Sequence, residues 1–181
     1  MSNYSIGNIE SIGASGKAWV GFHAVDIADL FFSELKNANR SIQISSFSTG
    51  YESPEMVNFF NILEEHLENP RMKISIIIND DGKEKTITPY ARKKLEKLQN
   101  DFPTQFFPQY FKQTKVKNLN KILHAKLTVI DGTTALIGSA NISKGALESN
   151  YEIMLKVTGQ VAVDFSKMLS ELSKQIRLNT A

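Results

Sequence analysis

The sequence predicts an α/β fold with a mixed β-sheet and helices on both faces of the sheet. Strand and helix patterns alternate through the first half of the 181-residue chain, whereas strand patterns follow one another in the second half. Alternation is typical of parallel strands joined by helices, and consecutive strands are typical of antiparallel pairs. The length and the hydrophobic content of 41% suit a single domain spanning residues 1–181 with its own core.

The elements of the first half are predicted from capping residues and apolar spacing. Residues 1–17 are rich in Ser, Gly and Asn, so we expect loop or a short edge strand there. Each helix is predicted where a capping side chain precedes apolar residues at helical spacing, and Pro marks the first turn of two of them. The predicted strands are Ala18–Phe22, Ser41–Phe47 and Lys73–Ile78, and the predicted helices begin at Asp26, Ser53 and Thr88.

The second half is predicted to be mostly strand. Asp131–Gly132 is a strong turn signal between two apolar runs, which indicates a β-hairpin. Apolar residues at helical spacing from Val161 to Ile176 indicate a closing amphipathic helix. The predicted strands of this half are Thr104–Phe107, Leu123–Ile130, Ala135–Gly138 and Tyr151–Val157.

Composition excludes some classes of site and leaves others open. The chain has no cysteine, which removes disulfides, thiolate zinc sites and cysteine nucleophiles. Neither a signal peptide nor an apolar run long enough to span a bilayer is visible, so we expect a cytoplasmic protein that needs no membrane.

The positive charge is concentrated in one segment. Between Asp101 and Asp131 there is no Asp or Glu. The lysines there could form a solvated loop, but their place before the segment discussed next favours contacts to a phosphate backbone. The lysines predicted to bind nucleic acid are Lys112, Lys115, Lys117 and Lys121. The aromatic residues interleaved with this segment are mostly expected in the core, although one or two could stack on bases: Phe106, Phe107, Tyr110 and Phe111.

The segment from His124 to Asn141 carries the predicted chemistry. His124 and Lys126 are two residues apart on a predicted strand, so their side chains should point to the same face. After the turn the chain returns to Ser139 and Asn141, which are again two apart and on one face. Lys126, Ser139 and Asn141 can donate to non-bridging phosphate oxygens, while His124 can attack phosphorus or transfer protons. A locally satisfied strand histidine is the alternative for His124, and its three neighbours argue against it.

This segment resembles a known family. HAKLTVID at His124–Asp131 fits the HxKx4D motif of the phospholipase D superfamily, and GSAN at Gly138–Asn141 resembles the GSxN element that follows it. Glu152 resembles the acidic residue that accompanies the histidine in these enzymes. The resemblance is specific over Ile122–Glu152. It implies a phospholipase D-like fold and a phosphodiesterase that uses neither a metal ion nor another cofactor.

The resemblance also implies a mechanism. A chain with one motif resembles the small bacterial nucleases that form a homodimer to complete the site. His124 of one protomer would attack phosphorus to give a phosphohistidine, and His124 of the partner subunit would protonate the leaving oxygen and then activate water. Lys126 and Asn141 would hold phosphate oxygens with Ser139 assisting. Glu152 would orient or charge-balance a histidine. Asp131 completes the motif, but its place at the turn favours a local role, in capping the hairpin or pairing with a neighbour.

Other motifs carry weaker signals. GASGK at Gly13–Lys17 lacks the glycine spacing, the hydroxyl residue and the preceding strand of a phosphate loop. NDDG at Asn79–Gly82 is explained by a strand-ending turn better than by a metal site. His23 and His66 have no companions and are expected to be structural, and three histidines without clustered carboxylates argue against a catalytic metal.

Fold and motif do not choose among the phosphodiesters that this family handles. The single motif, the adjacent basic segment and the lack of a membrane-binding amphipathic stretch favour a nucleic-acid endonuclease, either alone or as the catalytic half of a restriction-type enzyme. DNA is the favoured nucleic acid, although these three observations do not distinguish it from RNA. One alternative is a phospholipase or phosphatidyltransferase acting on lipids. Another is a catalytically silent dimer that binds nucleic acid.

Overall fold

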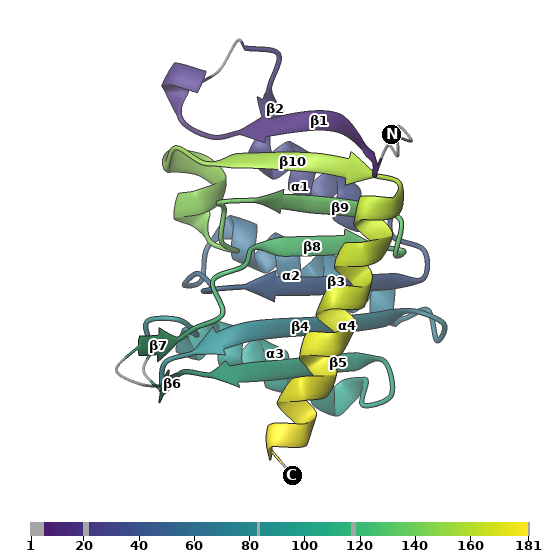
Figure 1. Ribbon diagram of the computed structural model, residues 1–181, viewed down its shortest axis with the longest axis vertical. Helices are drawn as coiled ribbons and strands as arrows, with labels where there is room; N and C mark the ends of the chain where they lie inside the picture. The colour runs from purple at the N-terminus through teal and green to yellow at the C-terminus, as the bar shows by residue number, and fades with distance from the viewer. Residues whose placement is uncertain (1–5, 20–21, 83, 117–118, 181) are drawn as a thin grey trace.

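The computed structural model describes residues 6–19, 22–82, 84–116 and 119–180 and contains one large sheet and four α-helices (Figure 1). The helices are α1 (Ile27–Lys36), α2 (Pro54–Leu67), α3 (Pro89–Asp101) and α4 (Gln160–Thr180). The strands are β1 (Asn8–Ala14), β2 (Val25–Asp26), β3 (Ser41–Ser46), β4 (Lys73–Asp80), β5 (Phe106–Lys112), β6 (Thr114–Val116), β7 (Leu119–Lys121), β8 (Leu127–Ile130), β9 (Thr134–Gly138) and β10 (Ile153–Thr158).

The large sheet is mixed, as the sequence predicts. Its strand order is β2-β1-β10-β9-β8-β3-β4-β5, while β6 and β7 form a separate two-stranded hairpin. The strands of the first half, β3, β4 and β5, run parallel, because a helix connects each to the next. Strands β8, β9 and β10 pair antiparallel, and β8 joins the two halves by pairing with β3.

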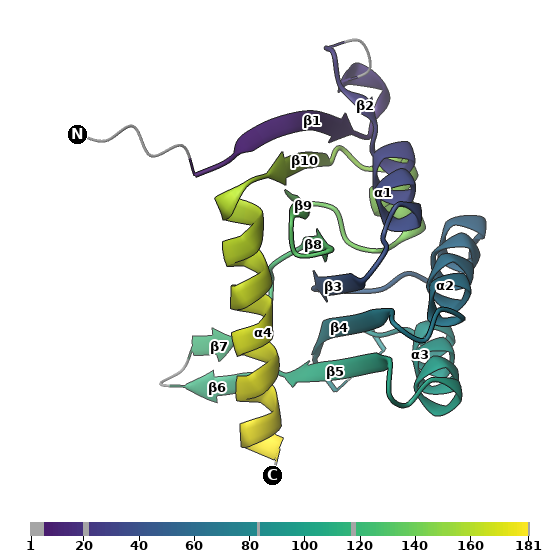
Figure 2. The same ribbon diagram turned by 90° about the vertical axis from the view of Figure 1, so that its right-hand side faces the viewer.

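Helices cover both faces of the sheet. Figure 2 shows α1, α2 and α3 on one face and α4 alone on the other. Strand β8 is buried on both sides: Ile130 belongs to the core beneath α1–α3, whereas Leu127 and Val129 pack with Leu169 of α4. The capping residues predicted for the first three helices are confirmed. The side chains of Asp26, Ser53 and Thr88 accept backbone N–H groups of the first turns.

The N-terminal region agrees with the prediction in part, since a strand is one of the two expectations for residues 1–17. Asn8–Ala14 forms a seven-residue strand that pairs with β10 on one side and with the short β2 on the other. The strand predicted at Ala18–Phe22 is wrong over its described part, because Lys17–Trp19 forms a 3-10 turn closed by a 3.0 Å hydrogen bond from the Trp19 N–H to the Gly16 carbonyl. Residues 20 and 21 lie outside the described residues.

Candidate active site

His124, Lys126, Ser139, Asn141 and Glu152 lie at one end of the central strands, where β3 and β9 end and β8 and β10 begin (Figure 1). Asp131 lies at the opposite end of β8, in the β8–β9 turn. The prediction that His124 and Lys126 lie within a strand is wrong, because β8 begins only at Leu127. The β3–β8 ladder starts with Ser45 opposite Leu127. Lys126 still lies next to β9, since its carbonyl accepts the Gly138 N–H at 3.4 Å. The backbone is held there by Ser45 Oγ, which donates to the Ala125 carbonyl at 3.0 Å.

His124 and Lys126 are in direct contact. Lys126 Nζ lies 3.2 Å from each imidazole nitrogen of His124 and donates to the His124 carbonyl at 3.0 Å. Phe47, the residue after β3, lies beneath both groups. Its ring centroid is 4.9 Å from that of His124 and 5.4 Å from Lys126 Nζ. The aromatic face therefore supports the imidazole and attracts the ammonium through a cation–π contact.

Phe47 is a site residue that the sequence did not reveal. It ends the stretch SIQISSF, whose alternating pattern is typical of an ordinary strand. Only the contact with His124 and Lys126 distinguishes it.

Lys126 is half-buried, and this matters for its charge. Burial lowers the pKa of its ammonium group below the ordinary value, while the nearby carboxylate of Glu152 acts in the opposite direction. A partly desolvated ammonium interacts more strongly with an anion than one in bulk water. Its environment thus favours a negatively charged ligand.

Ser139 and Glu152 form the second half of the site. Ser139 Oγ donates a short hydrogen bond to the Glu152 carboxylate and accepts the Ile153 N–H at 3.2 Å. Asn150 Nδ2 donates to the other carboxylate oxygen at 3.3 Å, so both oxygens of Glu152 have partners within the chain. Asn150 is a contact that the sequence did not predict. The predicted role of Glu152 beside a histidine stays a prediction.

Asn141 does not share its surroundings with Ser139, although the two are only two residues apart. Both follow the end of β9 at Gly138, so strand alternation does not orient them. Asn141 Oδ1 accepts the Ser48 N–H at 3.3 Å, and Asn141 lines a small internal cavity together with Lys126. A wider hollow of about 360 Å³ lies between His124, Lys126 and the apolar side of α4.

Asp131 has local partners. Its carboxylate accepts backbone N–H groups from Asn39 at 3.0 Å, Arg40 at 2.7 Å and Ser41 at 2.9 Å, which ties the β8–β9 turn to the loop before β3. Burial alone would raise the pKa of this carboxyl, but the hydrogen bonds from Ser41, Arg40 and Asn39 outweigh it and lower the pKa below its ordinary value. Asp131 also has a positive φ of 54°. The expected pairing of Asp131 with neighbouring groups is therefore present.

The basic segment is only partly described. Lys112 ends β5 and Lys121 ends β7, and both are exposed. Lys117 and the side chain of Lys115 lie outside what the structure describes. The β6–β7 hairpin that carries part of this segment projects beside the ends of β4 and β5, on the same side of the molecule as the site (Figure 1). Of the interleaved aromatics, Phe106 is buried in the core, whereas Phe107 is 41% exposed.

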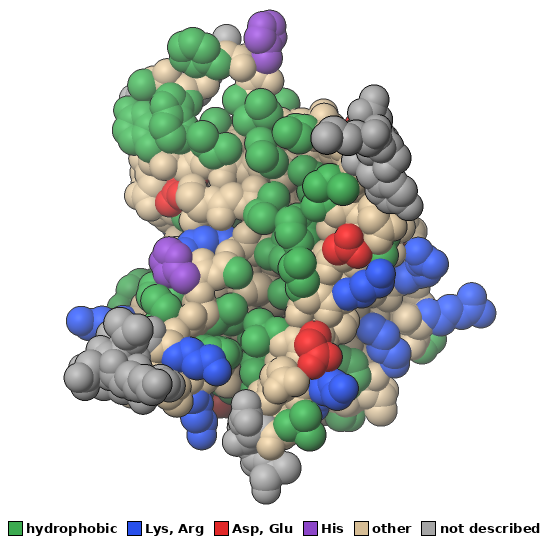
Figure 3. Space-filling view, viewed as in Figure 1, with side chains coloured by type: hydrophobic (Ala, Val, Ile, Leu, Met, Phe, Trp, Pro, Cys, Tyr) green, Lys and Arg blue, Asp and Glu red, His purple; other side chains and the backbone are tan. Residues whose placement is uncertain are grey.

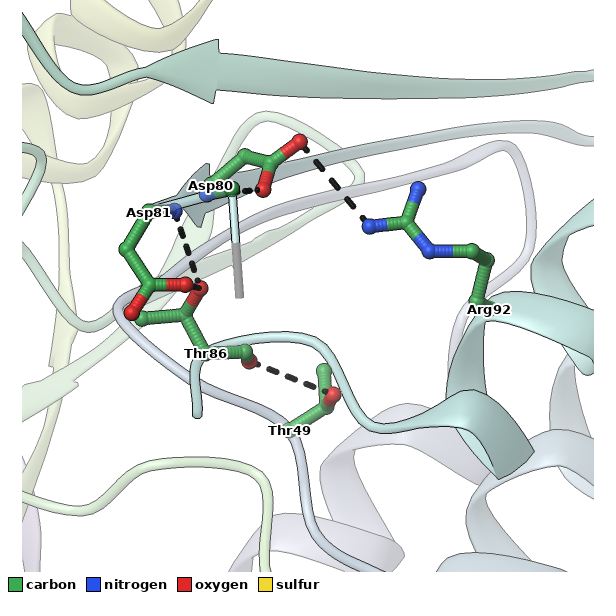
Figure 4. A network of polar contacts seen from close by, with 6 residues as sticks. Thr49, Asp80, Asp81, Thr86 and Arg92 are labelled. Carbon is green, nitrogen blue, oxygen red and sulfur yellow. Dashed lines mark hydrogen bonds and ion pairs between the residues drawn. The ribbon is translucent and has the colours of Figure 1, made fainter. Parts of the chain in front are cut away.

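The NDDG sequence ends strand β4 in a polar turn, as predicted. Figure 4 shows the network around it. Asp80 accepts the Gly82 N–H at 2.9 Å and lies 3.9 Å from Arg92, and Thr86 donates to Asp81 at 3.0 Å. Across the described residues, no three His, Asp or Glu side chains come close enough to hold a metal ion together. His66 bonds to the Leu35 carbonyl at 2.8 Å, which fits its predicted structural role.

A family model described as cardiolipin synthase, PLD-like domain matches residues 31–176, which include every candidate residue discussed above. The chain belongs to the phospholipase D superfamily. The predicted family and the predicted fold class are thereby confirmed. A search of curated protein sequences found no significant match.

Three solved structures share the fold. NucT from Helicobacter pylori is 20% identical with a TM-score of 0.62, and the alignment covers 92% of this chain and 93% of NucT. The phospholipase D family member Nuc from Salmonella typhimurium is 18% identical with a TM-score of 0.64, with 89% and 91% covered. A phosphatidylserine synthase from Haemophilus influenzae is 12% identical with a TM-score of 0.60, and the alignment covers 91% of this chain but 37% of that longer one.

Among the described helices, none is both long enough and apolar enough to cross a bilayer.

Proposed function

We propose that this chain is an endonuclease that hydrolyses nucleic-acid phosphodiesters through a phosphohistidine intermediate, at a site shared by two protomers. The contact that carries the proposal is that of His124 with the ammonium of Lys126, at 3.2 Å. It places a nucleophilic nitrogen beside a cation that can hold the phosphate under attack.

The reaction would proceed in two displacements. A His124 nitrogen forms a bond to phosphorus as the bond to the leaving oxygen breaks, and that oxygen takes a proton from His124 of the partner subunit. Water then attacks the phosphohistidine, gives its proton to the same partner histidine and releases His124. Lys126 would pair with the non-bridging oxygens throughout, and the amide of Asn141 would donate to them.

Ser139 and Glu152 have a supporting part in this proposal. Ser139 is exposed and already donates to Glu152, so its hydroxyl lies at the site rather than in the core. Glu152 balances the charge of Lys126, as its effect on the lysine pKa indicates. Asp131 would act only by fixing the hairpin, because its carboxylate is occupied by three backbone N–H groups.

Nucleic acid is the favoured substrate because exposed Lys112 ends β5 of the large sheet and exposed Lys121 ends β7 of the neighbouring hairpin, on the side of the molecule that carries the site. Surface lysines are suited to a phosphate backbone that continues beyond the scissile bond. Lipid phosphodiesters are the second candidate, since the matching family model is described as cardiolipin synthase.

One experiment separates these substrates. The purified chain is incubated in EDTA with supercoiled DNA, single-stranded DNA, RNA and vesicles that contain anionic phospholipid. We expect nucleic-acid cleavage that persists in EDTA, with DNA cut faster than RNA. His124→Ala should abolish it. His23→Asn is the matched control, because His23 is exposed and has a φ of 59° that Asn tolerates.

Three results would count against the proposal. Headgroup release from vesicles without nucleic-acid cleavage would make the chain a lipid enzyme. Cleavage that vanishes in EDTA and returns with Mg²⁺ would rule out the phosphohistidine route. DNA binding without turnover over a wide pH range would leave a nucleic-acid-binding dimer.

A further inference from the structure

An aromatic pair includes the residue that precedes Glu152 of the candidate site. Trp19 and Tyr151 meet edge to face, with ring centroids 5.3 Å apart and an angle of 73° between the ring planes. Tyr151 precedes Glu152, whose carboxylate accepts the hydrogen bond from Ser139. The aromatic pair therefore begins one residue from the site, and the proposed function makes no use of it.

The backbone around this pair is firmly held. Ser15 Oγ donates to the carbonyls of Ala146 at 3.1 Å and Asn150 at 2.8 Å, and the Ser15 N–H donates to the Glu152 carbonyl at 3.1 Å. These bonds join the N-terminal turn to the segment that carries Tyr151. The pair is thus positioned before any ligand arrives, which lowers the entropy lost on binding.

Gly16 allows the close approach of the two segments. A Cβ atom at this position would lie 2.6 Å from Tyr151 Cδ1 and 2.9 Å from Cε1, and the backbone φ is +92°. The Tyr151 ring is therefore packed against the Gly16 backbone on one side and against Trp19 on another. Even so, 57% of Tyr151 is exposed, which leaves ring surface free for a further planar group.

The surrounding surface is also apolar. Figure 3 shows hydrophobic side chains gathered at the upper left, over β1, β2 and the loop between them. The exposed residues there include Ile12 at 43%, Phe22 at 75% and Val25 at 46%. Such a surface beside a phosphate-binding site suits a ligand that carries both a phosphodiester and a flat apolar ring.

A membrane surface fits this patch less well. Exposed acidic residues border it, since Glu10 and Asp29 line a hollow together with Val25, and Asp26 follows directly. Patches that bind anionic membranes are bordered by Lys and Arg, because carboxylates there are repelled by the headgroups. Stacking of a single base involves only the ring surface.

We propose that Trp19 and Tyr151 form a stacking site for an unpaired nucleobase, next to the nucleotide whose phosphate is held by His124 and Lys126. This inference rests on the proposed function, and it makes single-stranded nucleic acid the preferred substrate class. A base in a duplex is already stacked on its neighbours, so it has no free face to offer to Tyr151.

The test uses the intrinsic fluorescence of the protein. Trp19 is the only tryptophan in the chain, so any change in tryptophan emission arises at the proposed site. A His124→Ala protein, which cannot turn over its ligand, is titrated with a single-stranded oligonucleotide and with an abasic oligonucleotide of equal length and charge. Duplex DNA and vesicles that contain anionic phospholipid complete the set.

We expect saturable quenching by the single strand and binding about tenfold weaker for the abasic strand, in the range known for one base on an aromatic ring. Tyr151→Leu should remove this difference, and Tyr151→Phe should retain it. Equal binding of the abasic and normal strands would overturn the inference, and so would an emission change with vesicles alone. The abasic comparison keeps Trp19 and Tyr151 intact, so it decides the matter even if Tyr151→Leu fails to fold.

Failure of this inference is distinguishable from failure of the proposed function. If the wild-type chain cleaves DNA without base-dependent quenching, only the stacking site is wrong. If quenching depends on bases but no substrate is cleaved, the stacking site stands and the nuclease proposal fails. In an active enzyme, Tyr151→Leu should raise KM for single strands with little change in kcat, because the ring contacts the base and not the reacting atoms.

Discussion

Replacing Asp131 tests whether this residue of the motif acts through structure or through chemistry. Its carboxylate accepts three backbone N–H groups from Asn39, Arg40 and Ser41, at the start of β3, at 2.7 to 3.0 Å. Hydrogen bonds to a charged group contribute about 1.5–3 kcal/mol each, but this segment is solvent-exposed, so about 1 kcal/mol each is the appropriate estimate. Asp131→Ala should therefore lose about 3 kcal/mol from the missing hydrogen bonds.

The backbone adds a second contribution. Asp131 has a φ of 54°, a conformation that Asp and Asn tolerate and that costs Ala about 1 kcal/mol. The free energy of unfolding of Asp131→Ala should thus fall by about 4 kcal/mol in total. Asp131→Asn keeps one acceptor oxygen and the tolerated φ, so it should lose only about 1–2 kcal/mol. Asp131→Gly removes the acceptor without the φ penalty and separates the two contributions.

Urea unfolding of the wild type and the three variants, followed by circular dichroism, gives these differences. The pH dependence has a defined sign. Because the folded-state pKa of Asp131 is lowered, its contribution is fully present above the unfolded pKa of about 3.9 and is lost as pH falls through the folded pKa. The gap between the wild type and Asp131→Asn should therefore close in acid.

Cleavage by folded Asp131→Asn should stay close to that of the wild type. The structural role would be refuted if Asp131→Asn unfolded like the wild type yet had lost its cleavage activity, because a direct part in the chemistry would then be required.

Three further predictions concern the site and its surroundings. A purified heterodimer of one wild-type and one His124→Ala protomer should lose nearly all turnover, because each phosphate needs both histidines. If the heterodimer kept about half of the wild-type activity, each protomer would work alone. Phe47→Leu should lower kcat about tenfold and move the basic limb of the pH–rate profile to lower pH, because loss of the cation–π contact lowers the pKa of Lys126. Phe47→Tyr should behave as wild type. A pH–rate profile that Phe47→Leu does not move would show that Phe47 contributes only packing. Replacing Lys112 and Lys121 by Gln should reduce the slope of log affinity against log salt concentration by roughly 1 to 2. An unchanged slope would show that these lysines belong to a solvated loop that does not bind the phosphate backbone.

The periodic parts of the fold follow from local chemistry, and the sequence alone predicts them. The Ser53 and Thr88 side chains each accept one N–H of the first turn, and Pro54 and Pro89 have no N–H to satisfy, so α2 and α3 begin where predicted. The run of β-branched residues in β4 indicates a strand covered on both sides, as the structure has it. The N-terminal strand β1 is less visible in the sequence, because Ser, Gly and Ile in NIESIGA form a strand only by pairing with β10.

For the site, the sequence by itself determined which chemical groups are available. The spacing of His124, Lys126, Ser139 and Asn141 is a property of the chain, and it is sufficient to indicate the family. Only the tertiary structure decided how they are oriented. His124 and Lys126 precede β8, so strand alternation alone does not orient them, and both side chains pack against Phe47. Trp19 and Tyr151 lie 132 positions apart in the sequence and meet only because β1 pairs with β10, a long-range contact that no local pattern encodes.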